Sequence, residues 1–303
     1  MKKLLIAGHI KYSKEQWAQL KTLDYEIIIV EDERLPLQMD VSDIEVVVCN
    51  SLFVYNSITK FKNLKLLHLT SAGMDRVPLD YIYKTGIKLF NAKGIYSIPM
   101  SEWVILKILE IYKKSKQFYK NQEQARWEKQ PDLLELTGKV ATIIGFGDVG
   151  IEVAKRLQAF GVYVVGIGRK NRESVLLDEY HTINEIDKVL EKSDIIISSL
   201  PLTEETRHLI DEEKIKRMKD GSVFINVSRG EVIDEIALIE AIHNNKFLGV
   251  ALDVFEDEPL SNESKWWNLE NVIITPHISF VSDKIRDRLF ELIFKNLNEN
   301  KIT

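Results

Sequence analysis

The sequence predicts an α/β protein with two Rossmann-like domains, each built on a parallel sheet. Short runs rich in Val, Ile and Leu recur along the chain and alternate with amphipathic or turn-like segments. This alternation is typical of parallel strands joined by crossover helices. The 303 residues are also enough for two domains of ordinary size.

The first third of the chain contains five of these runs: "KLLIAG", "YEIIIVE", "IEVVVCN", "LKLLHLT" and "IKLFNA". Between the first two runs, residues 13–22 place Trp17 and Leu20 on one side, as an amphipathic helix does. The pattern predicts a small α/β sheet.

The segment after these runs changes in character. Residues 103–112 are apolar on almost every side, and Ser101 is a suitable residue to cap the start of a helix there. A helix of this kind must be buried, either between domains or against another subunit. At the other end of the chain, residues 281–298 form an amphipathic pattern that is expected to return to the first domain.

The second block opens with "GKVATIIGFGDVGIEVAKRLQAFG". It continues with the runs "VYVVGI", "DIIISSLP", "SVFINVS", "FLGVALDVF" and "NVIITPH", and with a short strand near Tyr180 and His181. These runs predict a doubly wound nucleotide-binding sheet.

Three glycines follow the first strand of this block. Gly145 permits a tight turn, Gly147 lets the backbone approach a pyrophosphate, and Gly150 allows close packing of the next helix. Free N–H groups at the start of that helix attract negative charge. Asp148 lies inside the loop, and we expect its backbone N–H rather than its carboxylate to face the ligand. The sequence therefore predicts a dinucleotide site.

The next strand ends without the usual acid. Gly168 lies 23 positions after Gly145, close to the interval of about 20 at which a carboxylate binds the adenosine ribose. Gly168 is expected to leave room for a larger group, and Arg169 to bind a 2′-phosphate, while Lys170 and Arg172 add positive charge. We therefore expect NADP(H) to be favoured over NAD(H). The alternative is an exposed turn that happens to be basic.

Composition excludes several other functions. A net charge of −5 argues against nucleic acid or an anionic membrane surface as the main partner. The single Cys49 excludes an internal disulfide framework and suits a reducing cytoplasm. No apolar stretch approaches the roughly 20 residues of a membrane span, the first strand is too short for a signal peptide, and no metal site is expected.

Polar residues gather at the carboxyl ends of three predicted strands, where ligands bind in open α/β sheets. These stretches are "VSRG", "FEDEPL" and "PHIS". Each alone is explained equally well by a surface arginine, a loop glutamate or a structural histidine. Together they supply an anion clamp, a carboxylate and an imidazole.

Five stretches in this order, "GFGDVG", "LPLTEETRHLI", "INVSRGEVIDE", "ALDVFEDEPL" and "NVIITPHIS", resemble the D-isomer-specific 2-hydroxyacid dehydrogenase family, in particular its glyoxylate and hydroxypyruvate reductases. The similarity extends from "LTSAGMD" to the final helix. It implies that Arg229 binds substrate, that Glu258 orients the base, and that His277 donates and accepts the proton.

The resemblance also implies binding roles outside this catalytic group. Backbone N–H groups of Ser71, Ala72 and Gly73 would hold the substrate carboxylate, together with Arg229. Asp253 would bind the nicotinamide amide, and Leu200, Pro201 and Thr206 would lie over the cofactor. The full set expected at the cofactor is Gly145, Gly147, Asp148, Val149, Gly150, Gly168, Arg169, Lys170, Leu200, Pro201, Thr206, Val227, Asp253 and Ser279.

The chemistry of these roles is consistent. One guanidinium can neutralise the carboxylate of a 2-oxoacid and polarise its ketone. Hydride transfer from the nicotinamide to the ketone carbon leaves an alkoxide, so a protonated imidazole must supply a proton. A carboxylate paired with the imidazole favours its charged form. The expected activity is NAD(P)H-dependent reduction of a small 2-oxoacid to the D-2-hydroxyacid.

The family's organisation implies a flavodoxin-like substrate domain of residues 1–98 plus 279–303 and a dinucleotide-binding domain of residues 99–278, with the active site in a cleft between them. It also implies a homodimer formed through residues 101–112 and the following "QARWEKQPDLLEL" arm. The alternative is a nucleotide-sensing, non-catalytic binding protein on the same scaffold. Retention of Arg229, Glu258 and His277 favours chemistry. Candidates for the walls of the substrate side-chain pocket are Leu52, Phe53, Tyr96, Met100, Trp266 and Trp267.

Overall fold

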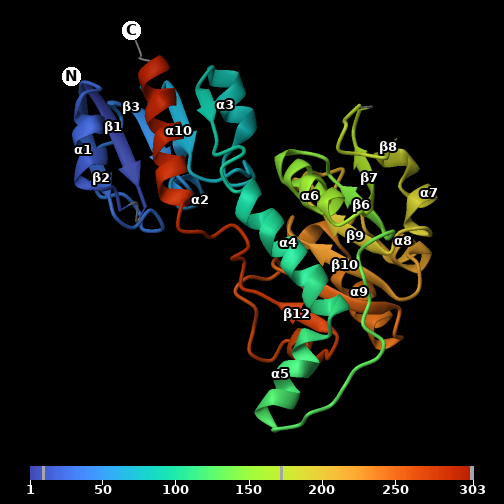
Figure 1. Cartoon of the computed structure of the whole chain (residues 1–303). Helices are drawn as coiled ribbons and strands as arrows, with labels where there is room; N and C mark the ends of the chain where they lie inside the picture. Colours follow the sequence, from blue (N-terminus) through green and yellow to red (C-terminus); the bar gives the residue numbers. More distant parts are fainter. Residues whose placement is uncertain (9–10, 171–172, 301–303) are drawn as a thin grey trace. The chain divides into compact units, whose positions relative to one another are not determined.

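The computed structural model describes residues 1–8, 11–170 and 173–300. The chain divides into two compact units (Figure 1). Unit 1 is Met1–Tyr96 with Ser282–Thr303, and unit 2 is Ser97–Val281. The sequence analysis placed the two boundaries between the domains at residues 98/99 and 278/279, a few positions from those of the structure.

Unit 1 contains a parallel five-stranded sheet in the order β2-β1-β3-β4-β5. Its strands are β1 (Lys2–Ala7), β2 (Tyr25–Val30), β3 (Ile44–Cys49), β4 (Leu66–Leu69) and β5 (Lys88–Phe90). Its helices are α1 (Lys14–Lys21), α2 (Leu52–Tyr55), the 3-10 helix η1 (Ile58–Lys60), α3 (Leu79–Thr85) and α10 (Ile285–Glu299). This strand order is that of a flavodoxin-like sheet.

Side chains of β1 alternate between the two faces of this sheet. Leu4 and Ile6 join the cluster that contains α1 and α10, whereas Leu5 and Ala7 face α2 and α3. The last helix thus completes the core of unit 1, where Figure 1 shows α10 in red beside the blue strands. A buried contact fixes it: Nε2 of His68 lies 3.0 Å from Nδ2 of Asn296. Burial lowers the pKa of His68 to about 4, so the ring is neutral near pH 7.

Unit 2 contains a parallel seven-stranded sheet in the order β12-β11-β10-β9-β6-β7-β8. Its strands are β6 (Val140–Ile144), β7 (Tyr163–Gly168), β8 (Glu179–Thr182), β9 (Ile195–Ser198), β10 (Ser222–Asn226), β11 (Phe247–Leu252) and β12 (Val272–Ile274). Its α-helices are α4 (Ser97–Tyr112), α5 (Ser115–Glu123), α6 (Asp148–Ala159), α7 (Asp187–Leu190), α8 (Glu212–Arg217) and α9 (Glu235–His243). The 3-10 helices are η2 (Ile183–Glu185), η3 (Gly230–Val232) and η4 (Lys265–Asn268).

The two faces of this sheet carry separate cores. Helices α4 and α6 pack on one face, and α7, α8 and α9 on the other. Strands β6 and β9 are neighbours in the sheet. The strands that follow β6 lie on one side of this pair, and those that follow β9 lie on the other side. Ligands bind at such a switch point, beyond the carboxyl ends of the strands. The sheet order confirms the predicted doubly wound α/β class.

Helix α4 begins earlier than the sequence suggested. It starts at Ser97, and Ser101 lies inside it, where its hydroxyl donates to the carbonyl of Ile98 at 2.6 Å. Pro99 is compatible with this start, because N–H groups in the first turn have no intrahelical acceptor. The prediction of Ser101 as the cap was therefore wrong. No helix within the described ranges is long and apolar enough to cross a membrane.

Candidate active site

The glycine loop joins β6 to α6. A Cβ atom on Gly145 would lie 2.8 Å from the carbonyl carbon of Ser199, and its φ of +101° also favours glycine. A Cβ on Gly150 would lie 2.6 Å from the carbonyl oxygen of Gly145. A Cβ on Gly147, by contrast, would meet no atom of the described residues within 4 Å. Open space therefore lies at the start of α6, as a bound pyrophosphate requires.

The loop after β9 borders the same switch point. The hydroxyl of Ser199 donates to the carbonyl of Gly145 at 2.7 Å, which joins this loop to the glycine loop. The hydroxyl of Thr206 donates to the carbonyl of Pro201 at 2.7 Å and accepts the N–H of Thr203 at 2.8 Å. Thr206 thus gives the loop its shape. Two further residues of the expected set, Leu200 and Val227, are buried.

Arg169 and Lys170 are exposed at the carboxyl end of β7. Hydrogen bonding to Thr203 and the positive charge of Arg169 both lower the pKa of Glu205, so Arg169 acts on the loop after β9. The third basic residue expected here, Arg172, lies outside the described residues. The space beside Gly168 is not empty: a Cβ there would lie 2.1 Å from the hydroxyl oxygen of Tyr180.

Arg229 follows β10 and precedes η3. Its Nη1 donates to the carbonyl of Ser228 at 2.8 Å. The next residue, Gly230, lies against the loop that carries Glu258. A Cβ on Gly230 would be 1.9 Å from the carbonyl carbon of Phe255 and 2.1 Å from the amide nitrogen of Glu256. Only glycine permits this approach, a constraint that sequence reasoning missed.

Glu258 and His277 form the pair that the sequence predicted. Oε2 of Glu258 lies 2.7 Å from Nδ1 of His277, and Oε1 accepts the N–H of Phe255 at 3.0 Å. Burial alone would raise the pKa of Glu258. The bonds from His277 and Phe255, with the positive charges of His277 and Arg229, outweigh burial and hold this pKa below its usual value.

His277 has a left-handed backbone, with φ of +50°, which is unusual for a residue other than glycine. The buried carboxylate of Asp253 stabilises this turn. It accepts the hydroxyl of Thr275 at 2.5 Å and the N–H groups of Ile278 and Ser279, both at 2.9 Å. Asp253 therefore orients the segment that carries His277, and its expected contact with nicotinamide stays a prediction.

A second network braces the Glu258 loop, and the sequence did not reveal it. Nε2 of His208 lies 2.8 Å from Oε1 of Glu256, and Oε1 of Glu235 accepts the N–H of Glu256 at 2.8 Å. Oε2 of Glu235 accepts the indole N–H of Trp266 at 3.2 Å, and burial raises the pKa of Glu235. Trp266 is almost wholly buried, so it is a core residue rather than an open pocket wall.

The predicted carboxylate-binding loop lies in unit 1, after β4. The carbonyl of Ser71 accepts the N–H of Ala92 at 2.9 Å, and that of Ala72 accepts Nδ2 of Asn91 at 2.7 Å. The carbonyl of Gly73 accepts the hydroxyl of Ser71 at 2.9 Å. These bonds hold the three carbonyl groups within unit 1. The N–H groups of the same peptides, which belong to Ala72, Gly73 and Met74, therefore point the other way.

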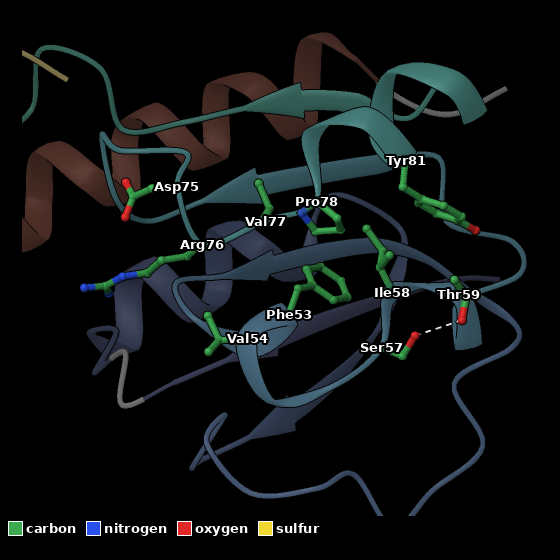
Figure 2. Close-up of a pocket in the computed structure, with 10 residues that line it drawn as sticks. All are labelled: Phe53, Val54, Ser57, Ile58, Thr59, Asp75, Arg76, Val77, Pro78 and Tyr81. Carbon is green, nitrogen blue, oxygen red and sulfur yellow. Dashed lines mark hydrogen bonds between the residues drawn. The ribbon is translucent and has the colours of Figure 1, made fainter. Parts of the chain in front are cut away.

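Unit 1 also contains a surface groove of about 470 Å³ between the segment after β3 and the start of α3 (Figure 2). Phe53 lies at its centre, Arg76 at one end and Tyr81 at the other. Leu52, by contrast, is fully buried in the core. Of these two candidates for a pocket wall, only Phe53 lines the groove.

Known proteins carry the same sequence features. Residues 105–279 match the model of the NAD binding domain of the D-isomer specific 2-hydroxyacid dehydrogenases. The chain belongs to the D-isomer specific 2-hydroxyacid dehydrogenase family. Membership makes it an oxidoreductase, and the match makes unit 2 its NAD-binding domain.

Individual members of this dehydrogenase family are similar over most of their length. The hydroxypyruvate reductase of Thermotoga maritima is 36% identical over 243 residues, covering 78% of each chain. The glyoxylate reductase of Thermofilum pendens is 35% identical over 243 residues, covering 78% of this chain and 71% of the relative. The D-lactate dehydrogenase from Aquifex aeolicus, solved with NAD and lactic acid, superposes with a TM-score of 0.82 at 29% identity, covering 96% of this chain and 93% of that one.

Proposed function

We propose that this dehydrogenase reduces a small 2-oxoacid to the D-2-hydroxyacid, with NADP(H) favoured over NAD(H). The observation that carries the proposal is the pair formed by Nδ1 of His277 and Oε2 of Glu258, 2.7 Å apart. A hydrogen-bonded, ionised carboxylate favours the protonated imidazole, which is the form that donates a proton. A protein that only sensed the nucleotide would need the glycine loop but not this pair.

The chain's own residues supply binding and proton transfer. Nε2 of His277 gives a proton to the carbonyl oxygen of the substrate as that oxygen becomes an alkoxide. The guanidinium of Arg229 neutralises the carboxylate and polarises the ketone. Asp253 keeps His277 in place by bonding the backbone on its carboxyl side. The bound nicotinamide supplies or accepts the hydride.

The loop of Ser71, Ala72 and Gly73 is proposed to bind the substrate carboxylate. Its carbonyl groups are bonded within unit 1, which supports this role for Ala72 and Gly73 because their N–H groups lie on the other side of the peptides whose carbonyls are bonded. Successive N–H groups arranged in this way form an anion-binding concavity.

The preference for NADP(H) is assigned to Arg169 with help from Lys170. Both are exposed beside Gly168, where an acid would repel a 2′-phosphate. Guanidinium groups bind phosphate through two parallel hydrogen bonds. Opposing this, Glu205 lies within the electrostatic reach of Arg169 and competes for its charge.

The proposed activity is tested with a panel of small 2-oxoacids, by following the loss of NADPH and NADH absorbance. We expect turnover with at least one 2-oxoacid and a higher kcat/KM with NADPH. His277→Asn should abolish turnover while leaving nucleotide binding intact. Nucleotide binding without turnover of any 2-oxoacid would contradict the reductase and favour a sensor.

Arg169→Ala tests the cofactor assignment. We expect kcat/KM for NADPH to fall by about tenfold or more, the size of a charge-assisted hydrogen bond, with little change for NADH. Arg217→Ala is the control. Arg217 ends α8 just before β10 begins, so it lies toward the amino ends of the strands, whereas Arg169 follows the carboxyl end of β7. Equal NADPH preference in the wild type and in Arg169→Ala would contradict the assignment.

We also propose that the dehydrogenase is a homodimer assembled through α4 and the arm that follows α5. Leu106 on α4 is 50% exposed and Trp127 in the arm is 98% exposed. Tryptophan is enriched among the residues that contribute most to protein–protein binding, which supports a role for Trp127 in this interface.

A further inference from the structure

Two glycines of β7 lie on the same face of the strand, because side chains two positions apart point the same way. A Cβ on Gly166 would lie 2.6 Å from Cδ1 of Leu177 and 3.1 Å from Cδ2 of Tyr180. A Cβ on Gly168 would lie 2.1 Å from the hydroxyl oxygen of Tyr180. The tyrosine ring thus covers the face that both glycines leave bare.

Tyr180 reaches this position from the neighbouring strand. It pairs with Gly166 in the parallel register of β7 and β8, and its side chain extends along the strand direction toward Gly168. Its ring also packs edge-on against Phe146, with ring centres 6.4 Å apart. Phe146 lies between the first two glycines of the cofactor loop, so the ring is held between that loop and β7.

The hydroxyl oxygen of Tyr180 consequently lies 2.1 Å from the place that the first side-chain carbon of an acid would take. In dinucleotide-binding folds that acid binds the hydroxyls of the adenosine ribose. A phenol differs from a carboxylate in two respects: it is neutral near pH 7, and it donates a hydrogen bond as well as accepting one. It therefore suits a phosphate at the 2′ position, which a carboxylate would repel.

We propose that Tyr180 is a specificity-determining residue of this dehydrogenase, and that its hydroxyl donates a hydrogen bond to the 2′-phosphate of the cofactor. The proposal rests on the NADP(H) preference proposed above and adds a second, uncharged determinant from β8. It also explains Gly168 differently from the sequence analysis. The glycine makes room for the tyrosine hydroxyl, and the hydroxyl meets the ligand.

Tyr180→Phe removes the hydroxyl and keeps the ring. Binding to the full-length chain is measured by calorimetry with 2′,5′-ADP and with 5′-AMP, which lacks the 2′-phosphate. We expect the variant to bind 2′,5′-ADP about tenfold more weakly and 5′-AMP less than about threefold more weakly. Tyr163→Phe is the matched control. Tyr163 is the first residue of β7, at the other end of the strand from Gly168, and its hydroxyl donates a hydrogen bond to Glu179 at 2.9 Å. It should leave both affinities unchanged.

A double-mutant cycle with Gly168→Ala keeps the test independent of any loss of folding. The added methyl group displaces the hydroxyl in the wild type, but in Tyr180→Phe its nearest neighbour becomes Cζ at 3.3 Å. We expect Gly168→Ala to weaken 2′,5′-ADP and the second change to add no further loss. Additive losses, or equal losses of both ligands in Tyr180→Phe, would overturn the proposal.

Failure of this inference is distinguishable from failure of the proposed reductase. If the chain is an active reductase but Tyr180→Phe binds 2′,5′-ADP as tightly as the wild type does, only the role of Tyr180 is wrong. A chain that reduces no 2-oxoacid, yet shows the expected cycle with 2′,5′-ADP, would overturn the reaction alone. If the wild type binds 2′,5′-ADP no more tightly than 5′-AMP, both the NADP(H) preference and the role of Tyr180 are wrong.

Discussion

At the scale of single residues, the site depends on how one carboxylate is kept ionised. Glu258 is partly shielded from water, which would favour its neutral form. Hydrogen bonds from His277 and from the backbone of Phe255 reverse this tendency, and its pKa falls below the usual value. Glu258 therefore stays negative throughout the neutral range and stabilises positive charge on His277.

Glu258→Gln should narrow the pH range of the reduction from its alkaline side. Glutamine can still hydrogen-bond Nδ1 but carries no charge, so it stabilises the protonated imidazole less than the carboxylate does. We expect the upper limb of the pH profile of kcat/KM for reduction to move to lower pH by about one unit. Asp257→Asn, an exposed carboxylate in the same loop, is the control and should not move the limb. An unmoved limb in Glu258→Gln would show that the pair does not set the protonation of the acid.

At the scale of elements, the site is a set of loops that brace one another. Gly230 at the start of η3 lies against the backbone of Phe255 and Glu256, which are three and two residues before Glu258. His208 and Glu235 bond the same segment from two other directions. The position of the Glu258 carboxylate is thus supported by η3, by the start of α9 and by the segment that carries His208.

Gly230→Ala should reduce activity strongly without unfolding the chain. Its methyl group would lie 1.9 Å from a backbone carbon, so the Glu258 loop has to shift. A displacement of about 1 Å at a catalytic group costs roughly 100-fold, and we expect kcat for reduction to fall by this order. Gly221→Ala separates this effect from backbone strain: Gly221 has a φ of +74°, but its Cβ would meet no described atom within 4 Å. It should lower the melting temperature and leave kcat unchanged, and similar kinetics in both variants would exclude loop displacement.

The same elements explain what the sequence could predict. The strands and the doubly wound sheet followed from apolar runs, because each run is a local feature of the sequence. The Glu258–His277 pair was implied by the family resemblance, which the order of the short motifs carries. Contacts between distant segments were not foreseen, such as Gly230 against Phe255, or Tyr180 over β7. The two glycines at alternate positions in "VVGIG" were a usable signal for the contact of Tyr180 with β7, because they leave one face of the strand without side chains. The start of α4 was misplaced because Ser101 was taken as the residue that caps the helix, whereas the helix begins at Ser97.

At the scale of the whole molecule, the proposed dimer rests on the exposed apolar residues of α4 and of the arm after α5. Lys107 of the same helix is buried and bonds Glu110 at 2.8 Å, whereas Leu106 is half exposed. Trp127 makes the arm still more apolar at its surface. Burying a leucine or tryptophan contributes about 1.5 to 3 kcal/mol, so these residues can contribute substantially to self-association.

Leu106→Glu should therefore convert the proposed dimer into a monomer. A charge buried in the interface and the loss of the apolar contact together cost roughly 3 kcal/mol or more, which raises the dissociation constant by a factor of at least about 100. Light scattering after gel filtration would then give about half the wild-type mass at micromolar concentration. Ile236→Glu is the matched control, since Ile236 on α9 is 81% exposed but lies outside α4 and the arm. A wild type that already has the mass of one chain would contradict the dimer, and equal dissociation in both variants would place the interface elsewhere.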